Sequence, residues 1–154
     1  MAIFYRAHKN RQIPIVFSGE GGLYTAGRWN YKGRKIVYCS QSLALATMEW
    51  LAHNGLSVSG FSYHKFSIEI PDNQLEKFNV SHLPLGWDSE PAVTASRDFS
   101  EQNLFQSGGL LAIAVPSIMV PEEYNLLLNP LHDKFISALN TARYLGEFKA
   151  PVRI

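Results

Sequence analysis

Apolar and polar side chains alternate most regularly along residues 63–70. The period of two predicts a β-strand with one buried face, and Pro71 ends it. The expected buried face carries His64, Phe66, Ile68 and Ile70. Residues 110–115 are apolar without interruption, which predicts a central strand buried on both faces. Shorter segments at residues 2–7, 35–39 and 124–128 predict three further strands.

A helix is expected between Ser40 and Gly55. Ser40 or Ser42 can supply the N-cap oxygen, and Gly55 follows where a residue with positive φ commonly ends a helix. Glu49 is the only charged side chain between residues 41 and 52, and the apolar positions leave no broad polar face. We therefore expect a helix that is buried on most sides, whose carboxylate needs hydrogen bonds or a cationic partner.

The remaining pattern predicts two more helical segments and a long loop. Residues 91–104 favour a helix with Pro91 in its first turn. Its expected inner positions are Ala92, Ala95, Phe99 and Leu104. The segment from residue 133 fits a helix up to about Ala142 and is extended from residue 144 to 154. Residues 18–33 contain five glycines and no regular pattern, which predicts a loop where backbone can approach a ligand closely.

Composition indicates one globular domain, residues 1–154. The chain has 154 residues, of which 46% are hydrophobic and 18% charged, with a net charge of +1. Since no basic block is present, direct nucleic-acid binding is not expected. The low charged fraction indicates either a large core or apolar surface that a partner covers.

Several classes of site have no support in the sequence. Cys39 is the single cysteine, and its place in an expected buried strand favours an inert thiol. The five histidines form no metal-binding pair, so no metal site and no metal cofactor are expected. Neither a signal peptide nor an apolar run of membrane-spanning length is visible, which makes the cytoplasm the expected location.

The candidate chemistry lies around the helix that contains Glu49. Arg28, in the glycine-rich loop, is the nearest guanidinium in sequence to Glu49, and Tyr38 lies on the strand that leads into the helix. A catalytic group is one interpretation, and a structural ion pair beside a core tyrosine is the other. Ser117 directly follows the apolar strand, where a hydroxyl can contact a ligand or cap a turn.

Together these pieces resemble the RES-domain family, the toxin half of bacterial RES–Xre toxin–antitoxin pairs. The resemblance spans nearly the whole chain, in order and spacing. Its matching elements are Tyr5-Arg6, Gly27-Arg28-Trp29-Asn30, Val37-Tyr38, Met48-Glu49, Pro116-Ser117, Asn125, and Asn129-Pro130 with His132. One departure is the segment Arg97-Asp98-Phe99, where family members often have Gly-Asp-Trp.

The resemblance implies an α+β fold similar to the ADP-ribosyltransferase toxins, with a central mixed or antiparallel sheet and flanking helices. It implies cleavage of the nicotinamide–ribose bond of NAD, which depletes NAD and stops growth. The outcome is phosphorolysis with inorganic phosphate, hydrolysis, or ADP-ribosylation of a protein. The implied partners are an Xre-type helix-turn-helix antitoxin and, within that complex, a second copy of the toxin.

The expected roles follow from this chemistry. Glu49 would stabilise positive charge on the ribose, Tyr38 would contact the ribose or nicotinamide, and Arg28 would hold phosphate with two parallel hydrogen bonds. Ser117 would bind substrate or fix Glu49. Further candidates for substrate contact are Arg6, Trp29, Asn30 and His132. A module that binds a phosphorylated small molecule without turnover is the alternative, in which Glu49 is only a structural partner.

Overall fold

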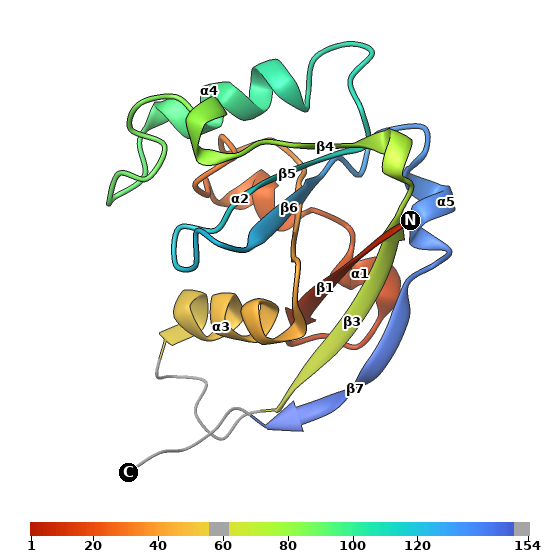
Figure 1. Cartoon of the computed structure of the whole chain (residues 1–154). Helices are drawn as coiled ribbons and strands as arrows, with labels where there is room; N and C mark the ends of the chain where they lie inside the picture. Colours follow the sequence, from red (N-terminus) through yellow and green to blue (C-terminus); the bar gives the residue numbers. More distant parts are fainter. Residues whose placement is uncertain (56–61, 150–154) are drawn as a thin grey trace.

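The computed structural model describes residues 1–55 and 62–149, and its strands form one mixed sheet (Figure 1). The strand order is β4-β5-β6-β2-β1-β3-β7. Only β4 and β5 pair in parallel, and every other neighbouring pair is antiparallel. The strands are β1 Ala2–His8, β2 Val37–Ser40, β3 Ser62–Ile70, β4 Leu75–Lys77, β5 Ala112–Pro116, β6 Tyr124–Leu128 and β7 Arg143–Lys149. This arrangement confirms the expected α+β class.

The strands with the strongest patterns are confirmed. Phe66, Ile68 and Ile70 on β3 are fully buried, and all five residues of β5 are buried. β4 was not predicted, because a strand of three residues that pairs with β5 is too short to show a recognisable period. The expected extended C-terminal segment forms β7, and its last residues, 150–154, lie outside the described residues.

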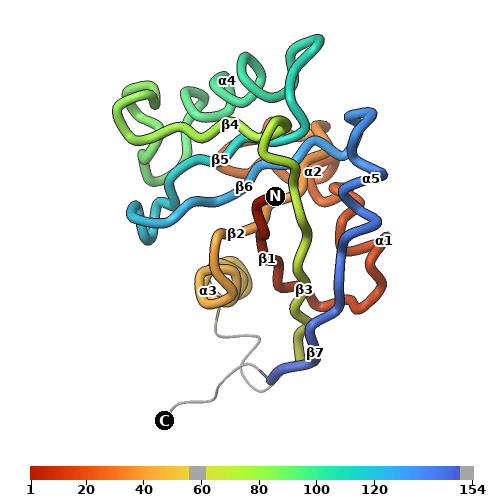
Figure 2. The backbone as a smooth tube through the Cα atoms, turned by 45° about the vertical axis from the view of Figure 1, so that its right-hand side comes forward, coloured from red at the N-terminus to blue at the C-terminus, as the bar shows by residue number. Residues whose placement is uncertain are grey.

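Helices cover both faces of the sheet (Figure 2). On one face, α1 (Ile13–Val16) and α5 (Phe135–Leu139) pack over a core that contains Phe17, Phe66 and Ile68. On the opposite face, α3 (Leu43–Asn54) packs against β1 and β3 through Trp50 and Leu51, and α4 (Thr94–Asn103) lies over β5 and β6. The short helix α2 is Gly21–Tyr24, and 3₁₀ turns occur at Asp72–Gln74 and Val80–His82.

The expected deep burial of the helix around Glu49 is wrong. Ser42 caps α3 through a bond to the Leu45 amide and Gly55 ends it with φ 68°, as its sequence predicts. However, only Leu45 and Ala46 are buried, because α3 packs on the sheet with a single face. Met48 is consequently 39% exposed, beside the charged residue.

The start and inner face of α4 also differ from expectation. The helix begins at Thr94, after Pro91. Leu104 is buried and Phe99 packs against the core as expected, but Ser96 and Ser100 are buried where alanines were expected. Each hydroxyl donates to a carbonyl, Ser96 to that of Arg28 and Ser100 to that of Ser96. Because these hydrogen bonds satisfy the hydroxyls, serine is tolerated where hydropathy predicts apolar residues. No helix in the described ranges is both long and apolar enough to cross a membrane.

Candidate functional site

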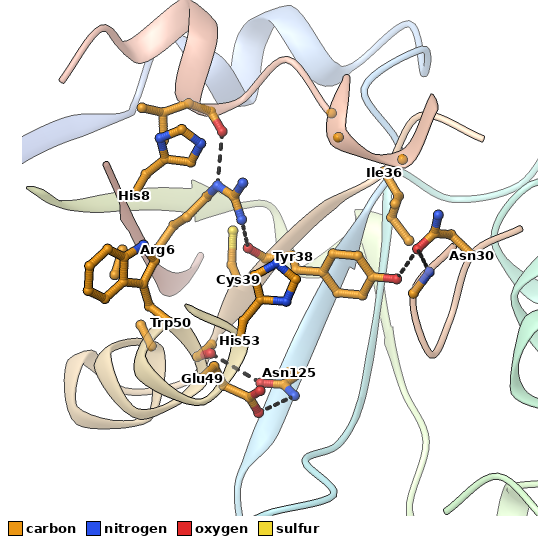
Figure 3. Close-up of a pocket in the computed structure, with 18 of the residues that line it drawn as sticks. Arg6, His8, Asn30, Ile36, Tyr38, Cys39, Glu49, Trp50, His53 and Asn125 are labelled. Carbon is orange, nitrogen blue, oxygen red and sulfur yellow. Dashed lines mark hydrogen bonds between the residues drawn. The ribbon is translucent and has the colours of Figure 1, made fainter. Parts of the chain in front are cut away.

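A cavity of about 560 Å³ opens where the sheet is weakest. β1 and β2 pair at a single position, Tyr5 with Ser40, the last residue of β2. The cavity reaches both faces of the sheet here, because its lining includes Val16 from the α1 face and Glu49 from the α3 face (Figure 3). The loop of residues 18–30 forms its remaining wall.

The carboxylate of Glu49 faces this cavity from α3. Its Oε1 accepts two hydrogen bonds, from the Ser117 hydroxyl at 3.0 Å and from the Asn125 amide at 2.9 Å. Asn125 is oriented in turn, because its Oδ1 accepts from the Ser40 hydroxyl at 3.1 Å. Within residues 1–55 and 62–149 no hydrogen bond reaches Oε2. One carboxylate oxygen is thus fixed by the protein and the other is available to a ligand.

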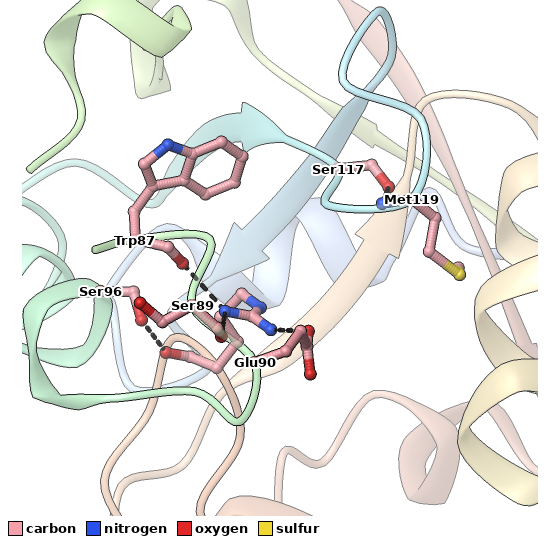
Figure 4. Close-up of polar contacts among 7 residues, drawn as sticks. Trp87, Ser89, Glu90, Ser96, Ser117 and Met119 are labelled. Atoms are coloured by element: carbon pink, nitrogen blue, oxygen red, sulfur yellow. Dashed lines mark hydrogen bonds and ion pairs between the residues drawn. The ribbon is translucent and has the colours of Figure 1, made fainter. Parts of the chain in front are cut away.

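Ser117 lies behind this carboxylate. Its side chain is fully buried and is not among the residues that line the cavity. Its oxygen also accepts from the backbone amides of Met119 (3.1 Å) and Val120 (3.2 Å), just beyond β5 (Figure 4). Of the two expected roles, the geometry matches the one in which Ser117 fixes Glu49.

Arg28 lines the cavity without touching Glu49. Its Nη1 donates to the carbonyls of Trp87 (2.9 Å) and Ser89 (2.8 Å), and its Nη2 forms an ion pair with Glu90 (Figure 4). The structural Arg28–Glu49 ion pair, one of the two interpretations of the sequence, is not formed, because Glu90 pairs with Arg28 and hydrogen bonds satisfy Glu49. A guanidinium has five N–H donors, so these contacts leave Nε–H and one Nη2–H for a ligand.

A hydrogen bond between Tyr38 and Asn30 ties the glycine-rich loop to β2. The Tyr38 hydroxyl donates to Asn30 Oδ1 at 2.5 Å, and the same oxygen accepts the Gly27 amide at 2.9 Å. Burial raises the pKa of Tyr38 well above its ordinary value, so the phenol stays neutral. A Cβ on Gly27 would lie 2.5 Å from Asn30 Oδ1 and 2.7 Å from the Tyr38 hydroxyl, which explains the glycine.

Trp29, between these residues, serves mainly the core. It is buried, stacks on Trp87 with ring centroids 6.1 Å apart, and meets the edge of Phe99. Trp29 and Asn30 both border the cavity, yet most of their side-chain contacts hold the loop that carries Arg28.

Arg6 is a second guanidinium of the cavity, held by backbone carbonyls. Its Nε donates to the carbonyl of Val16 at 2.9 Å and its Nη1 to that of Tyr38 at 2.7 Å. No carboxylate of the described chain forms an ion pair with it. Burial lowers the pKa of Arg6. A desolvated guanidinium with three unused N–H donors favours an anionic ligand.

Comparison with known proteins agrees with this geometry. The family model described as RES domain matches residues 3–146. The chain belongs to the RES-domain toxin family. It is 34% identical over 144 residues to Toxin Res of Yersinia enterocolitica, covering 94% of each chain. It is also 42% identical over 135 residues to the Prs ADP-ribosylating toxin of a Sphingobium species, covering 83% of this chain and 82% of that one.

The segment Arg97-Asp98-Phe99, within α4, supports the loop of Arg28. Arg97 Nε donates to the Gly27 carbonyl at 2.8 Å, and Asp98 accepts from the Tyr31 hydroxyl. Phe99 contacts Trp29, as described above. His132, a further candidate from the resemblance, bonds the Gly109 carbonyl at 2.9 Å and does not line the cavity, so the structure gives it a role in the fold.

Two histidines of this RES domain border the cavity and were not singled out from the sequence. His8 Nδ1 accepts the Asn10 amide at 2.9 Å, and burial, with the positive charge of Arg6, lowers the pKa of His8 to about 4. His53 follows Glu49 by four residues on α3 and also lines the cavity. The i, i+4 spacing, which puts two side chains on one helix face, was the signal available for His53.

The site carries no other evident reactive group. Burial raises the pKa of Cys39 to about 12, so its thiol is inert, as expected. Among the described residues no three His, Cys, Asp or Glu side chains come together in a way that could hold a metal ion.

Proposed function

We propose that this RES domain is a toxin that cleaves the nicotinamide–ribose bond of NAD. The observation that carries the proposal is the carboxylate of Glu49, fixed at Oε1 and open at Oε2, in a cavity that also presents guanidinium groups. NAD has the matching chemistry, since it joins an anionic pyrophosphate to a ribose that becomes cationic when nicotinamide leaves.

The role proposed for Glu49 is electrostatic. As the glycosidic bond breaks, positive charge develops at C1″ and the ring oxygen of the ribose. A carboxylate whose orientation is already fixed stabilises that charge without reorganising. Ser117, directly after β5, and Asn125, on β6, supply this fixation from two neighbouring strands of the sheet.

Arg6 and Arg28 are proposed to hold the pyrophosphate. Arg6 has three unused N–H donors and no carboxylate partner among the described residues, which makes it the stronger anchor. Arg28 keeps two N–H donors but is already paired with Glu90, so its net attraction for an anion is smaller. This order reverses the one expected from the sequence.

For the acceptor we favour inorganic phosphate, followed by water. An anion can be held beside either guanidinium group, and positioning a nucleophile in this way supplies a large effective concentration. Phosphorolysis would give ADP-ribose 1″-phosphate and nicotinamide, with no cofactor beyond the two substrates.

Transfer of ADP-ribose to a protein is the second candidate. The Sphingobium relative, 42% identical, is named an ADP-ribosylating toxin. In either case the proposed partner is an Xre-type antitoxin with a helix-turn-helix domain. We also propose that two copies of the toxin pair within that complex.

The test is to incubate the purified protein with NAD and to follow nicotinamide release with and without inorganic phosphate. Phosphorolysis predicts a rate that rises with phosphate and ADP-ribose 1″-phosphate as the product by mass. Free ADP-ribose at a phosphate-independent rate would leave hydrolysis, and a labelled protein target would indicate transfer. NAD binding without nicotinamide release in any arm, including one with a cell extract as a source of targets, would leave the non-catalytic binding module.

A further inference from the structure

We infer that His53 is the general base that activates a neutral acceptor, such as water or a side-chain hydroxyl, for attack on the ribose. This inference rests on the proposed cleavage of NAD. It names a residue for the second half of the reaction, in which the acceptor replaces nicotinamide at C1″.

The position of His53 fits this role. It lies four residues after Glu49 on α3, and both side chains line the cavity, so they project from the same face of the helix. In Figure 3 the imidazole extends from α3 toward the ring of Tyr38. His53 is exposed and makes no hydrogen bond to any part of the chain that the structure describes. Its ring nitrogens are therefore free to accept a proton and to pass it to solvent.

The buried groups around the cavity are unsuited to accept the proton. His8 Nδ1 accepts the Asn10 amide, which leaves the neutral ring with its hydrogen on Nε2 and no vacant basic nitrogen. Tyr38 already donates its proton to Asn30, and burial keeps it neutral. Cys39 is held as a thiol by burial.

The carboxylates that line the cavity are also unsuited to accept the proton. Glu49 Oε1 is occupied by two donors, and Oε2 is the oxygen that faces the developing ribose cation in the proposed reaction. Glu20 comes from the loop before α2 on a different wall of the cavity. His53 is the cavity-lining base adjacent to Glu49, one helical turn away. It also lies in the last turn of α3, where the partial negative charge of the helix end stabilises a positive charge.

The bond between C1″ and the nicotinamide nitrogen breaks, and its electron pair leaves with neutral nicotinamide. The acceptor oxygen forms a bond to C1″ while its proton passes to the imidazole of His53, which later releases that proton to water. An anionic nucleophile such as azide carries no proton to remove and would not need His53.

The experiment compares water and azide as acceptors in His53→Ala. In phosphate-free buffer, nicotinamide release should fall about 100-fold, in line with the loss of a general base. Added sodium azide should restore most of the rate, with ADP-ribosyl azide as the product by mass. His82→Ala is the matched control, since His82 lies outside the cavity in a 3₁₀ turn, and it should keep the unmodified protein's rate.

The outcomes separate this inference from the proposed function. If His53→Ala releases nicotinamide in water as fast as the unmodified protein, the inference is wrong and NAD cleavage stands. A loss that azide does not restore, in a variant that still binds NAD, would also overturn the role as a base. If the unmodified protein releases no nicotinamide with water, phosphate, azide or a cell extract as a source of protein acceptors, the proposed function itself fails.

Discussion

At the scale of single residues, the site depends on Glu49. The protein holds its Oε1, and its Oε2 is open to a ligand. Glu49 was identifiable from the sequence, because it is an isolated charge among apolar helix positions. Of its partners, Ser117 was one candidate for fixing Glu49, whereas the contact with Asn125 was not predictable, since the two residues lie 68 and 76 positions away along the chain. Contacts of this length arise from strand order, which no local pattern encodes.

Glu49→Gln should remove most of the activity and keep the fold. Glutamine has nearly the same shape, and its carbonyl oxygen can still accept from Ser117 and Asn125. The negative charge that faces the ribose is lost, which should lower kcat for nicotinamide release about 100- to 1,000-fold. Circular dichroism and the thermal midpoint should match the unmodified protein. A folded variant with near-normal kcat would remove Glu49 from the catalytic role.

Ser117→Ala should lower both stability and activity, which distinguishes it from Glu49→Gln. The buried hydroxyl serves Glu49 and the amides of Met119 and Val120, so its loss leaves buried donors unpaired. Such groups cost about 1–3 kcal/mol of unfolding free energy, measurable by urea denaturation. We expect kcat to fall about tenfold with KM little changed, because Asn125 still holds Glu49. Unchanged stability and kcat would contradict this account.

At the scale of elements, Arg28 is held by the loop that contains Trp87, Ser89 and Glu90, where the sequence shows no regular hydrophobic pattern. The carbonyls of Trp87 and Ser89 fix its Nη1, and Glu90 balances its charge. Strands with an obvious period were predictable, whereas the inner face of α4 was not, because its buried serines bond backbone carbonyls. Sequence patterns thus located the elements but not the charge balance between them.

Glu90→Gln should strengthen the binding of anionic substrate modestly. The Glu90 side chain is 70% exposed, and exposed ion pairs are worth about 0–1 kcal/mol, so KM for NAD should fall by no more than about fivefold. Arg28→Ala should have the opposite effect and raise KM. Steady-state kinetics at low and high salt tests both, since the gain from Glu90→Gln should shrink as salt screens the charges. A higher KM for Glu90→Gln would indicate that Glu90 supports the loop and does not compete with substrate.

At the scale of the whole molecule, exposed apolar side chains lie on the segments that build the site. Met48 precedes Glu49, Met119 follows Ser117, and Leu85 lies on the loop that holds Arg28, with its side chain fully exposed. Apolar surface covered by a partner was one of the two explanations for the low charged fraction of the sequence, a large core being the other. In the fold, Met48, Met119 and Leu85 lie on the segments that carry or support Glu49 and Arg28.

The exposed apolar residues offer a docking surface for the proposed helix-turn-helix antitoxin. If it covers the mouth of the cavity, the purified complex should release nicotinamide much more slowly than the free toxin. Leu85→Asp should then leave the free toxin's rate unchanged, because the Leu85 side chain is fully exposed and holds none of the groups around Glu49. The same variant should need a higher concentration of antitoxin for half-inhibition, since an aspartate in an apolar contact is costly. Titration of both toxins with antitoxin measures this shift directly. A complex that cleaves NAD at the free toxin's rate would show that the partner binds elsewhere.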